Sequence, residues 1–362
     1  MVSPAEFATW ALRAHAAMER HLRLRGCLYR RPGWLGRLGV AEHLWPVARA
    51  LAATVDLAGV PAQLRPGFEV EAAIDRQLRG LERYWDARGP WPAYASDLCR
   101  APWGGDRYYD DNAWVGLALV QLDRVQPGTA PAGRAAALFE FARSGWSTDA
   151  EAPWPGGTFW VEQGRGTGRR NHDRNTVSTA PNAELGLHLD ELEGAGRRRA
   201  DAERMYDWVH GALRTPEGLY FDRVRGDGRV DRALWSYNQG SMIGAAVLRL
   251  RGSGRREFLS AAEATARTAL RRYAGRYLEQ PPAFNAIFFR NLLLLHRATG
   301  DSELRGLIRG ALGAYAEEAW SRRGDDDLLA RADGPPSLLD QSALVSVLAL
   351  AAWAPGDYER LA

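Results

Sequence analysis

The strongest constraint on the fold is a helical periodicity that recurs along the whole chain, with no convincing alternating strand longer than a few residues. This pattern predicts an all-α protein with twelve helical segments. Their approximate ranges are 4–23, 40–57, 67–86, 110–124, 132–144, 181–192, 197–213, 238–251, 256–273, 283–298, 302–319 and 338–353.

The connections between these segments alternate in length. Those before the even-numbered segments are long, as at 146–180 and 215–237, whereas most others are as short as Gly194-Ala195-Gly196. Stacked helical hairpins place such insertions on one face, which is usually the functional one. The even-numbered segments are also the more apolar, as an inner ring should be. We therefore predict an (α/α)6 toroid over residues 1–362 as a single domain, with a mouth where the inner helices begin.

The charged residues indicate no particular class of partner. The formal net charge is +3, and the 47 basic residues, all arginines, are scattered among 44 acidic ones, so we expect no nucleic-acid binding. Cys27 and Cys99 have no histidine at metal-ligand spacing, and we expect neither a disulfide framework nor a metal site. No stretch reaches the ~18 apolar residues of a membrane span, and the N-terminus shows no leader, so we expect a cytoplasmic protein.

Two adjacent carboxylates, Asp110 and Asp111, lie between Tyr108-Tyr109 and Trp114 where a loop becomes a helix. Glycosidic bond cleavage requires a pair of carboxyl groups, and in retaining enzymes these lie about 5–5.5 Å apart. The helix N-terminus favours ionisation of both, whereas mutual repulsion and aromatic surroundings raise one pKa. The pair is therefore a candidate for one ionised and one protonated aspartate.

Other inner helices also begin with polar residues, and we expect these to face the mouth. They are Asn182, Asn238-Gln239, Asn285 and Asp340-Gln341. The alternative is that each one only caps its helix.

Tryptophan is concentrated in the long connections, although loops normally leave large apolar side chains to the core. Sugar rings stacking on the indoles would explain this, and so would indoles that pin the loops to the toroid. Seven of the 14 tryptophans are in or beside these connections: Trp34, Trp91, Trp103, Trp146, Trp154, Trp160 and Trp235.

Several segments together resemble glycoside hydrolase family 76, the endo-α-1,6-mannanases. Residues 109–114, Tyr-Asp-Asp-Asn-Ala-Trp, are similar to its catalytic motif, and residues 235–244 are similar to its Tyr-Asn-Gln-Gly signature. Gly156-Gly157-Thr158-Phe159-Trp160, residues 175–182 and residues 284–290 resemble further family segments. Thr158, Phe159 and Asn285 depart from the usual residues, which bears on the precise substrate more than on the reaction.

The resemblance implies a retaining endo-glycosidase that cleaves α-1,6-mannosidic linkages in α-mannan, mannooligosaccharides or mannolipids without a cofactor. Asp110 would be the nucleophile and Asp111 the acid/base. Tyr237, Asn238 and Gln239 would hold sugar hydroxyls, and Trp160 would form a stacking wall. Further substrate contacts are expected from Tyr109, Asn112, Asn182 and Asn285.

Three alternatives stay open at the level of sequence. A transglycosidase would use the same chemistry with a sugar hydroxyl in place of water. A non-catalytic mannan-binding protein would keep the carboxylates as hydrogen-bond acceptors only. A sugar epimerase would need histidine acid/base groups, and no histidine opens an inner helix.

Overall fold

The computed structural model describes residues 2–99, 105–163, 171–194, 196–331 and 334–362. The α-helices in these ranges are α1 (Pro4–Leu22), α2 (Trp34–Arg37), α3 (Leu44–Gly59), α4 (Val70–Leu81), α5 (Tyr109–Val125), α6 (Arg134–Ser144), α7 (Thr176–Glu193), α8 (Arg199–Leu213), α9 (Ser236–Ser253), α10 (Arg256–Tyr273), α11 (Pro282–Ala298), α12 (Ser302–Ser321) and α13 (Leu338–Ala352). Five two-residue strands lie in the loops: β1 (Trp85–Asp86), β2 (Ala93–Tyr94), β3 (Arg174–Asn175), β4 (Arg223–Val224) and β5 (Val230–Asp231).

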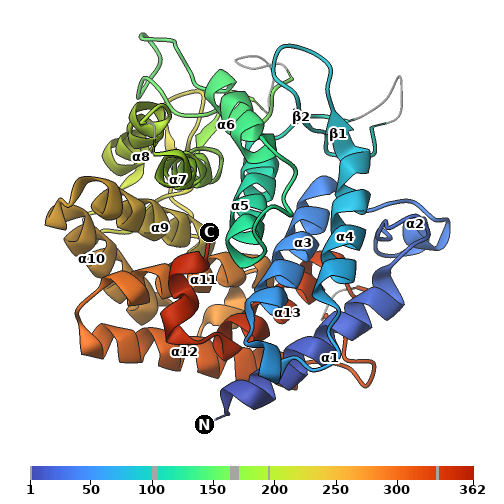
Figure 1. Ribbon diagram of the computed structural model, residues 1–362. Helices are drawn as coiled ribbons and strands as arrows, with labels where there is room; N and C mark the ends of the chain where they lie inside the picture. The colour runs from blue at the N-terminus through green and yellow to red at the C-terminus, as the bar shows by residue number, and fades with distance from the viewer. Residues whose placement is uncertain (1, 100–104, 164–170, 195, 332–333) are drawn as a thin grey trace.

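The helices form two concentric rings, so the predicted all-α toroid is confirmed. Figure 1 shows α1, α4, α6, α8, α10 and α12 around the periphery and the other long helices inside them. Each inner helix contacts the next in the order α3, α5, α7, α9, α11 and α13, and α13 contacts α3. The first helix, α1, packs against the last one, α13. The sixth helix pair is therefore formed by the two ends of the chain.

The predicted ranges are close to the observed ones, with clear errors in α4 and α7. The range 67–86 extended past the end of α4 at Leu81 into β1. The prediction began α7 at Pro181, because proline commonly opens a helix. The helix begins at Thr176 instead, with Pro181 as its sixth residue. Proline has no N–H to donate to the carbonyl of Val177, but only that one bond near the helix start is lost. The extra helix α2 is a single turn inside a long loop.

The inner helices are buried on nearly all sides, as their composition predicts. Leucine, valine and alanine occupy most buried positions of α13, and leucine, phenylalanine, alanine and isoleucine together do so in α11. Close approach of two inner helices requires a glycine at one position. A Cβ atom on Gly240 of α9 would lie 2.8 Å from the Cα of Phe288 in α11.

An ion pair lies inside the ring, between helices that are not neighbours. Arg290 of α11 donates to the Asp56 carboxylate of α3 at 2.6 Å, and the two side chains are 5% and 0% exposed. Gln121 of α5 accepts from Arg290 and donates to Asp56 at 2.7 Å. The indole of Trp353, directly after α13, donates to the Asp56 carbonyl at 2.7 Å. The cluster therefore connects four of the six inner helices.

A second buried group, Glu184 of α7, has no fully compensating partner. Its side chain is completely buried, and burial raises its pKa to about 8 although the positive charge of Arg290 opposes the shift. Burial therefore favours the protonated form of Glu184 at neutral pH.

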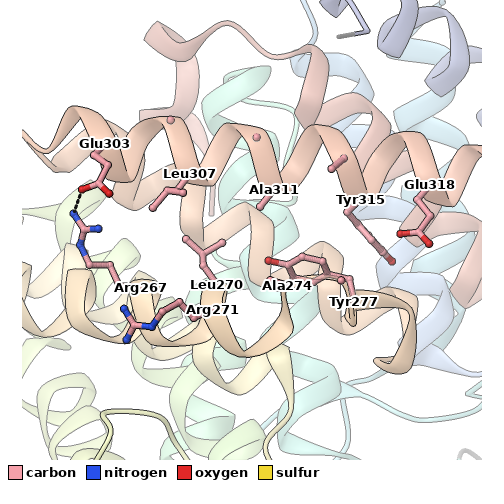
Figure 2. A pocket seen from close by; sticks show the side chains of 14 residues that line it. Arg267, Leu270, Arg271, Ala274, Tyr277, Glu303, Leu307, Ala311, Tyr315 and Glu318 are labelled. Atoms are coloured by element: carbon pink, nitrogen blue, oxygen red, sulfur yellow. Dashed lines mark hydrogen bonds and ion pairs between the residues drawn. The ribbon is translucent and has the colours of Figure 1, made fainter.

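A groove of about 820 Å³ runs between the outer helices α10 and α12 (Figure 2). It exists because α12 presents small residues there, among them Gly306, Gly310 and Ala311. Arg267 and Glu303 form an ion pair across one end. None of the site residues predicted from the sequence lines this groove.

Replacing Asp56 by alanine should lower the free energy of unfolding by about 3–5 kcal/mol, because Arg290 would be left buried and unpaired. Chemical denaturation followed by circular dichroism measures the change. The control is Asp75→Ala, which removes an exposed pair with Arg79 and should change stability by under about 1 kcal/mol. A double Asp56→Leu, Arg290→Met variant should lose less than Asp56→Ala does. An equal loss in both would show that the charges themselves are not decisive.

Replacing Glu184 by glutamine should stabilise the protein increasingly as the pH rises from about 4.5 to 8. The unfolded chain releases the proton near pH 4.5, whereas the folded chain retains it up to about pH 8, so the wild type loses stability across this interval. Melting temperatures at pH 5 and pH 8 measure the difference, which should grow to a few degrees. Glu318→Gln, on the exposed side of α12, is the control. A pH-independent difference would contradict the prediction.

Candidate active site

Five inner helices carry a polar side chain at their fourth position that binds the loop leading into the helix. Three of them are amides that pair with both an N–H and a carbonyl of the loop. Asn112 pairs with Tyr94 in this way, and Gln239 pairs with Tyr220, at 2.8–3.0 Å. Gln341 accepts from the N–H of Leu329 and donates to the carbonyl of Asp327.

In the other two inner helices of this set, the side chain makes a single hydrogen bond to the loop. Thr179 of α7 accepts from the N–H of Thr158, and Asn285 of α11 donates to the carbonyl of Tyr277. Asn182, one turn further along α7, donates to the carbonyl of Tyr109 at 3.1 Å. Polar residues at the starts of the inner helices therefore hold the mouth loops in place.

This arrangement divides the residues expected at the substrate into buried ones and ones near the aspartate pair. Asn112, Asn182, Gln239 and Asn285 are at most 1% exposed and bind backbone or neighbouring side chains. Tyr109 is fully buried and stacks on Phe141. The structure places these five behind the mouth surface. It brings Asp110, Asp111, Trp160 and Tyr237 together with one further carboxylate, to which the equally buried Asn238 donates.

Asp110 is the second residue of α5 and is about nine-tenths buried. The indole N–H of Trp160 donates to its Oδ2 at 3.0 Å. Burial raises the pKa of Asp110 to about 6, and the hydrogen bonds from Trp160 and from the N–H of Asp111 limit the rise. Trp160 is held by Tyr108, whose ring meets the indole edge to face at 5.1 Å.

Asp111, the next residue, has the higher pKa of the two. Burial raises it first, and the negative charge of Asp110 raises it further. No donor comparable to Trp160 acts on Asp111 in the described structure. These surroundings favour the proton on Asp111 and the negative charge on Asp110.

Tyr237, at the start of α9, faces both the pair and a third carboxylate. Its ring stacks on Phe284 at 3.8 Å and lies 6.5 Å from the ring of Trp114. Burial raises the phenol pKa well above its usual value, and the charges of Asp222 and Asp110 add to the rise. The hydroxyl therefore stays protonated and is available as a donor.

The third carboxylate, Asp222, was missed in the sequence. It is 9% exposed, and the Asn238 amide donates to its Oδ1 at 3.4 Å. Burial raises its pKa, and the Arg223 guanidinium opposes that shift. Asp222 lies just before β4 in the loop pinned by Gln239. The polar pair Asn238-Gln239 downstream was the only signal in the sequence that could have pointed to it.

The loop tryptophans divide into exposed and partly buried ones. Trp34, Trp91 and Trp154 are 69%, 40% and 47% exposed. Trp146, Trp160 and Trp235 are partly buried and pack against the hydrophobic core or the site. Trp103 lies outside the described residues.

No group of three or more histidine, cysteine or acidic side chains in the described residues could hold a metal ion. Within the same residues, no helix is long and apolar enough to cross a membrane.

Solved structures share the fold at low identity. The family 76 mannosidase Bt3792 from Bacteroides thetaiotaomicron VPI-5482 is 20% identical, with a TM-score of 0.80 over 96% of this chain and 98% of that one. The α-1,6-mannanase of Salegentibacter sp. HEL1_6 is 19% identical, with a TM-score of 0.74 over 96% and 99%. An inactive variant of that mannanase, with two consecutive aspartates replaced by asparagine, is in complex with α-1,6-mannotriose and has a TM-score of 0.75 over 96% and 99% at 19% identity.

No curated protein sequence matches the chain. A sequence profile matches residues 82–327, about two thirds of the length, and these include the aspartate pair, Trp160, Asp222 and Tyr237. The protein belongs to glycosyl hydrolase family 76 and is a glycoside hydrolase.

Proposed function

We propose that the protein is a retaining endo-glycosidase that cleaves α-1,6-mannosidic linkages through Asp110 and Asp111. The observation that carries the proposal is the pair itself, two adjacent carboxyl groups whose surroundings push their pKa values apart. The substrate is inferred from the Salegentibacter mannanase, which shares the fold and whose variant lacking two consecutive aspartates is inactive with α-1,6-mannotriose bound.

The difference in pKa supports the division of roles. Asp110 is the more readily ionised, because Trp160 and backbone N–H groups donate to it, so it is suited to attack the anomeric carbon. Asp111 keeps its proton and can transfer it to the leaving oxygen. After the glycosyl-enzyme ester forms, Asp111 is ionised and can take a proton from the attacking water.

The surrounding side chains would position the sugar ring. The Tyr237 phenol provides a donor, and the nearby Asp222 carboxylate provides an acceptor. This combination suits neighbouring hydroxyls of a pyranose. Trp160 and Tyr108 provide an aromatic wall next to Asp110. Asn238 holds Asp222 and so acts on the sugar indirectly.

Asp110→Asn and Asp111→Asn should each lower hydrolysis of α-1,6-mannan at least about 10²–10⁴-fold, with circular dichroism and melting temperature near those of the wild type. An aryl α-mannoside with an acidic phenol as leaving group separates the roles, because it needs no proton from Asp111. Asp111→Asn should retain release of the phenol and be accelerated by azide, whereas Asp110→Asn should not. The control is Asp325→Asn, an exposed aspartate in the loop before α13.

Product analysis distinguishes the remaining alternatives. Proton NMR of the first product should show the α anomer, and the products should be oligosaccharides rather than mannose alone. Initial release of the β anomer would exclude the retaining mechanism. Chains longer than the substrate would indicate a transglycosidase. Binding of mannan without any cleavage would indicate a binding protein.

The pH dependence of kcat/KM should show an acid limb near pH 6, because Asp110 must be ionised to attack. Trp160→Phe removes the N–H that stabilises the ionised form, so it should raise this pKa and move the acid limb to higher pH. Because the two carboxyl groups interact, the limb reports the pair rather than one residue. The opposite shift, or none, would show that Trp160 does not tune the nucleophile.

A further inference from the structure

A second pocket opens in the loop between α6 and α7, on the mouth side of the ring. Its volume is about 420 Å³. Trp146 and Phe159 supply aromatic surface, and Thr148, Asp149 and His172 supply exposed polar groups. The function proposed above uses none of these side chains.

The pocket and the aspartate pair lie on opposite sides of residues 159–161. Phe159 forms an antiparallel bridge with Arg174, and Val161 forms one with Tyr108, so residues 159–161 run in extended form. Consecutive side chains of an extended segment point to opposite sides. Trp160 points to Asp110, whereas Phe159 lines the pocket. A single extended segment therefore separates the two sites.

The walls of the pocket are fixed before any ligand arrives. Arg174, 2% exposed, donates to the carbonyls of Pro153, Trp154 and Gly156 at 2.6–3.2 Å. The guanidinium of Arg204 lies over the Trp146 ring at 4.5 Å. Such preorganisation lowers the entropy lost on binding.

An exposed tryptophan in the same loop is held in a strained conformation. Trp154 has a φ of +55°, in the left-handed region that tryptophan rarely adopts, and its side chain is 47% exposed. Arg174 and the Trp208 indole both donate to its carbonyl. Trp154 is two residues from Ala152, which lines the pocket. Strain of this kind is concentrated at ligand-binding sites.

We propose that this pocket is a second, non-catalytic sugar-binding site, which holds a pyranose unit of the polysaccharide while another part of the chain lies at Asp110. The proposal rests on the proposed function for the identity of the sugar. Aromatic surface suits the C–H face of a pyranose, and a carboxylate, a hydroxyl and an imidazole suit its hydroxyls. An anionic ligand fits less well, because the Arg174 guanidinium is directed to backbone carbonyls and Asp149 is acidic.

The test uses α-1,6-mannotriose as probe and the Asp110→Asn, Asp111→Asn double variant as an uncleaving parent. Calorimetry should find two bound trisaccharides per chain in the parent and one after adding Asp149→Ala and His172→Ala. In the active enzyme, the same two pocket changes should lower kcat/KM on α-1,6-mannan about 5–10-fold and leave mannotriose cleavage unchanged. Trp154→Asn, in which asparagine tolerates the positive φ, should also lower kcat/KM on the polymer and leave mannotriose cleavage unchanged. Asp227→Ala, on a neighbouring exposed turn, is the control.

Some outcomes would overturn the proposal. A single bound trisaccharide in the parent would do so, and so would equal loss on polymer and trisaccharide. If the wild type does not cleave α-1,6-mannan, the proposed function fails, but the pocket is still tested with mannose, glucose and galactose trisaccharides. Binding of one of these sugars that is lost with Asp149→Ala and His172→Ala would support the proposed pocket. If none of the three sugars shows a binding site that depends on these two residues, the proposal is refuted.

Discussion

The ion pair between Arg290 and Asp56 holds together helices that the ring itself would keep apart. α3 and α11 are separated by α13 in the order of the inner ring, yet Arg290 reaches Asp56 and Gln121 across the interior. Because the Trp353 indole joins the same group, the first, second, fifth and sixth inner helices share one buried network. A buried charge pair adds little net stability compared with apolar packing, but it disfavours every arrangement in which either charge is unpaired. It therefore favours one register of the closed ring.

The pair Asp110 and Asp111 depends on the same division between a fixed interior and a polar mouth. Asp110 and Asp111 begin an inner helix, where the helix dipole and free N–H groups stabilise a negative charge. Burial opposes ionisation, and Trp160 supplies a donor to one carboxylate only. Two chemically identical neighbours become different because the Trp160 indole and backbone N–H groups donate to Asp110. The loop that places this indole is fixed by Thr179 through Thr158, so the positioning of Trp160 depends on α7 as well as on α5.

The helical ring could be predicted from the sequence because helical periodicity is visible within each segment. Features that depend on contacts between distant segments could not be predicted in this way. The inner and outer helices each show a periodicity or an apolar composition that is visible within one segment. The helical turn before Pro181 was hidden because proline usually marks a helix start rather than a sixth residue. Asn112, Gln239 and Asn285 were expected at the sugar because they begin inner helices, but position along a helix does not reveal which side faces the loop. Asp222 was missed because its contact with Asn238 depends on the path of the intervening loop.

The polar residues at the fourth helix positions have a consequence for how such an enzyme diversifies. Each one binds a short part of its loop to the helix that follows, as Asn112 does for Tyr94 and Gln341 does for Leu329. The chain between two such contacts can then change in length and sequence without altering the ring beneath it. The mouth therefore consists of loops that can vary independently on a common helical ring. Exchanging one loop between relatives, with its contact to the helix retained, is a route to altered specificity that leaves the scaffold intact.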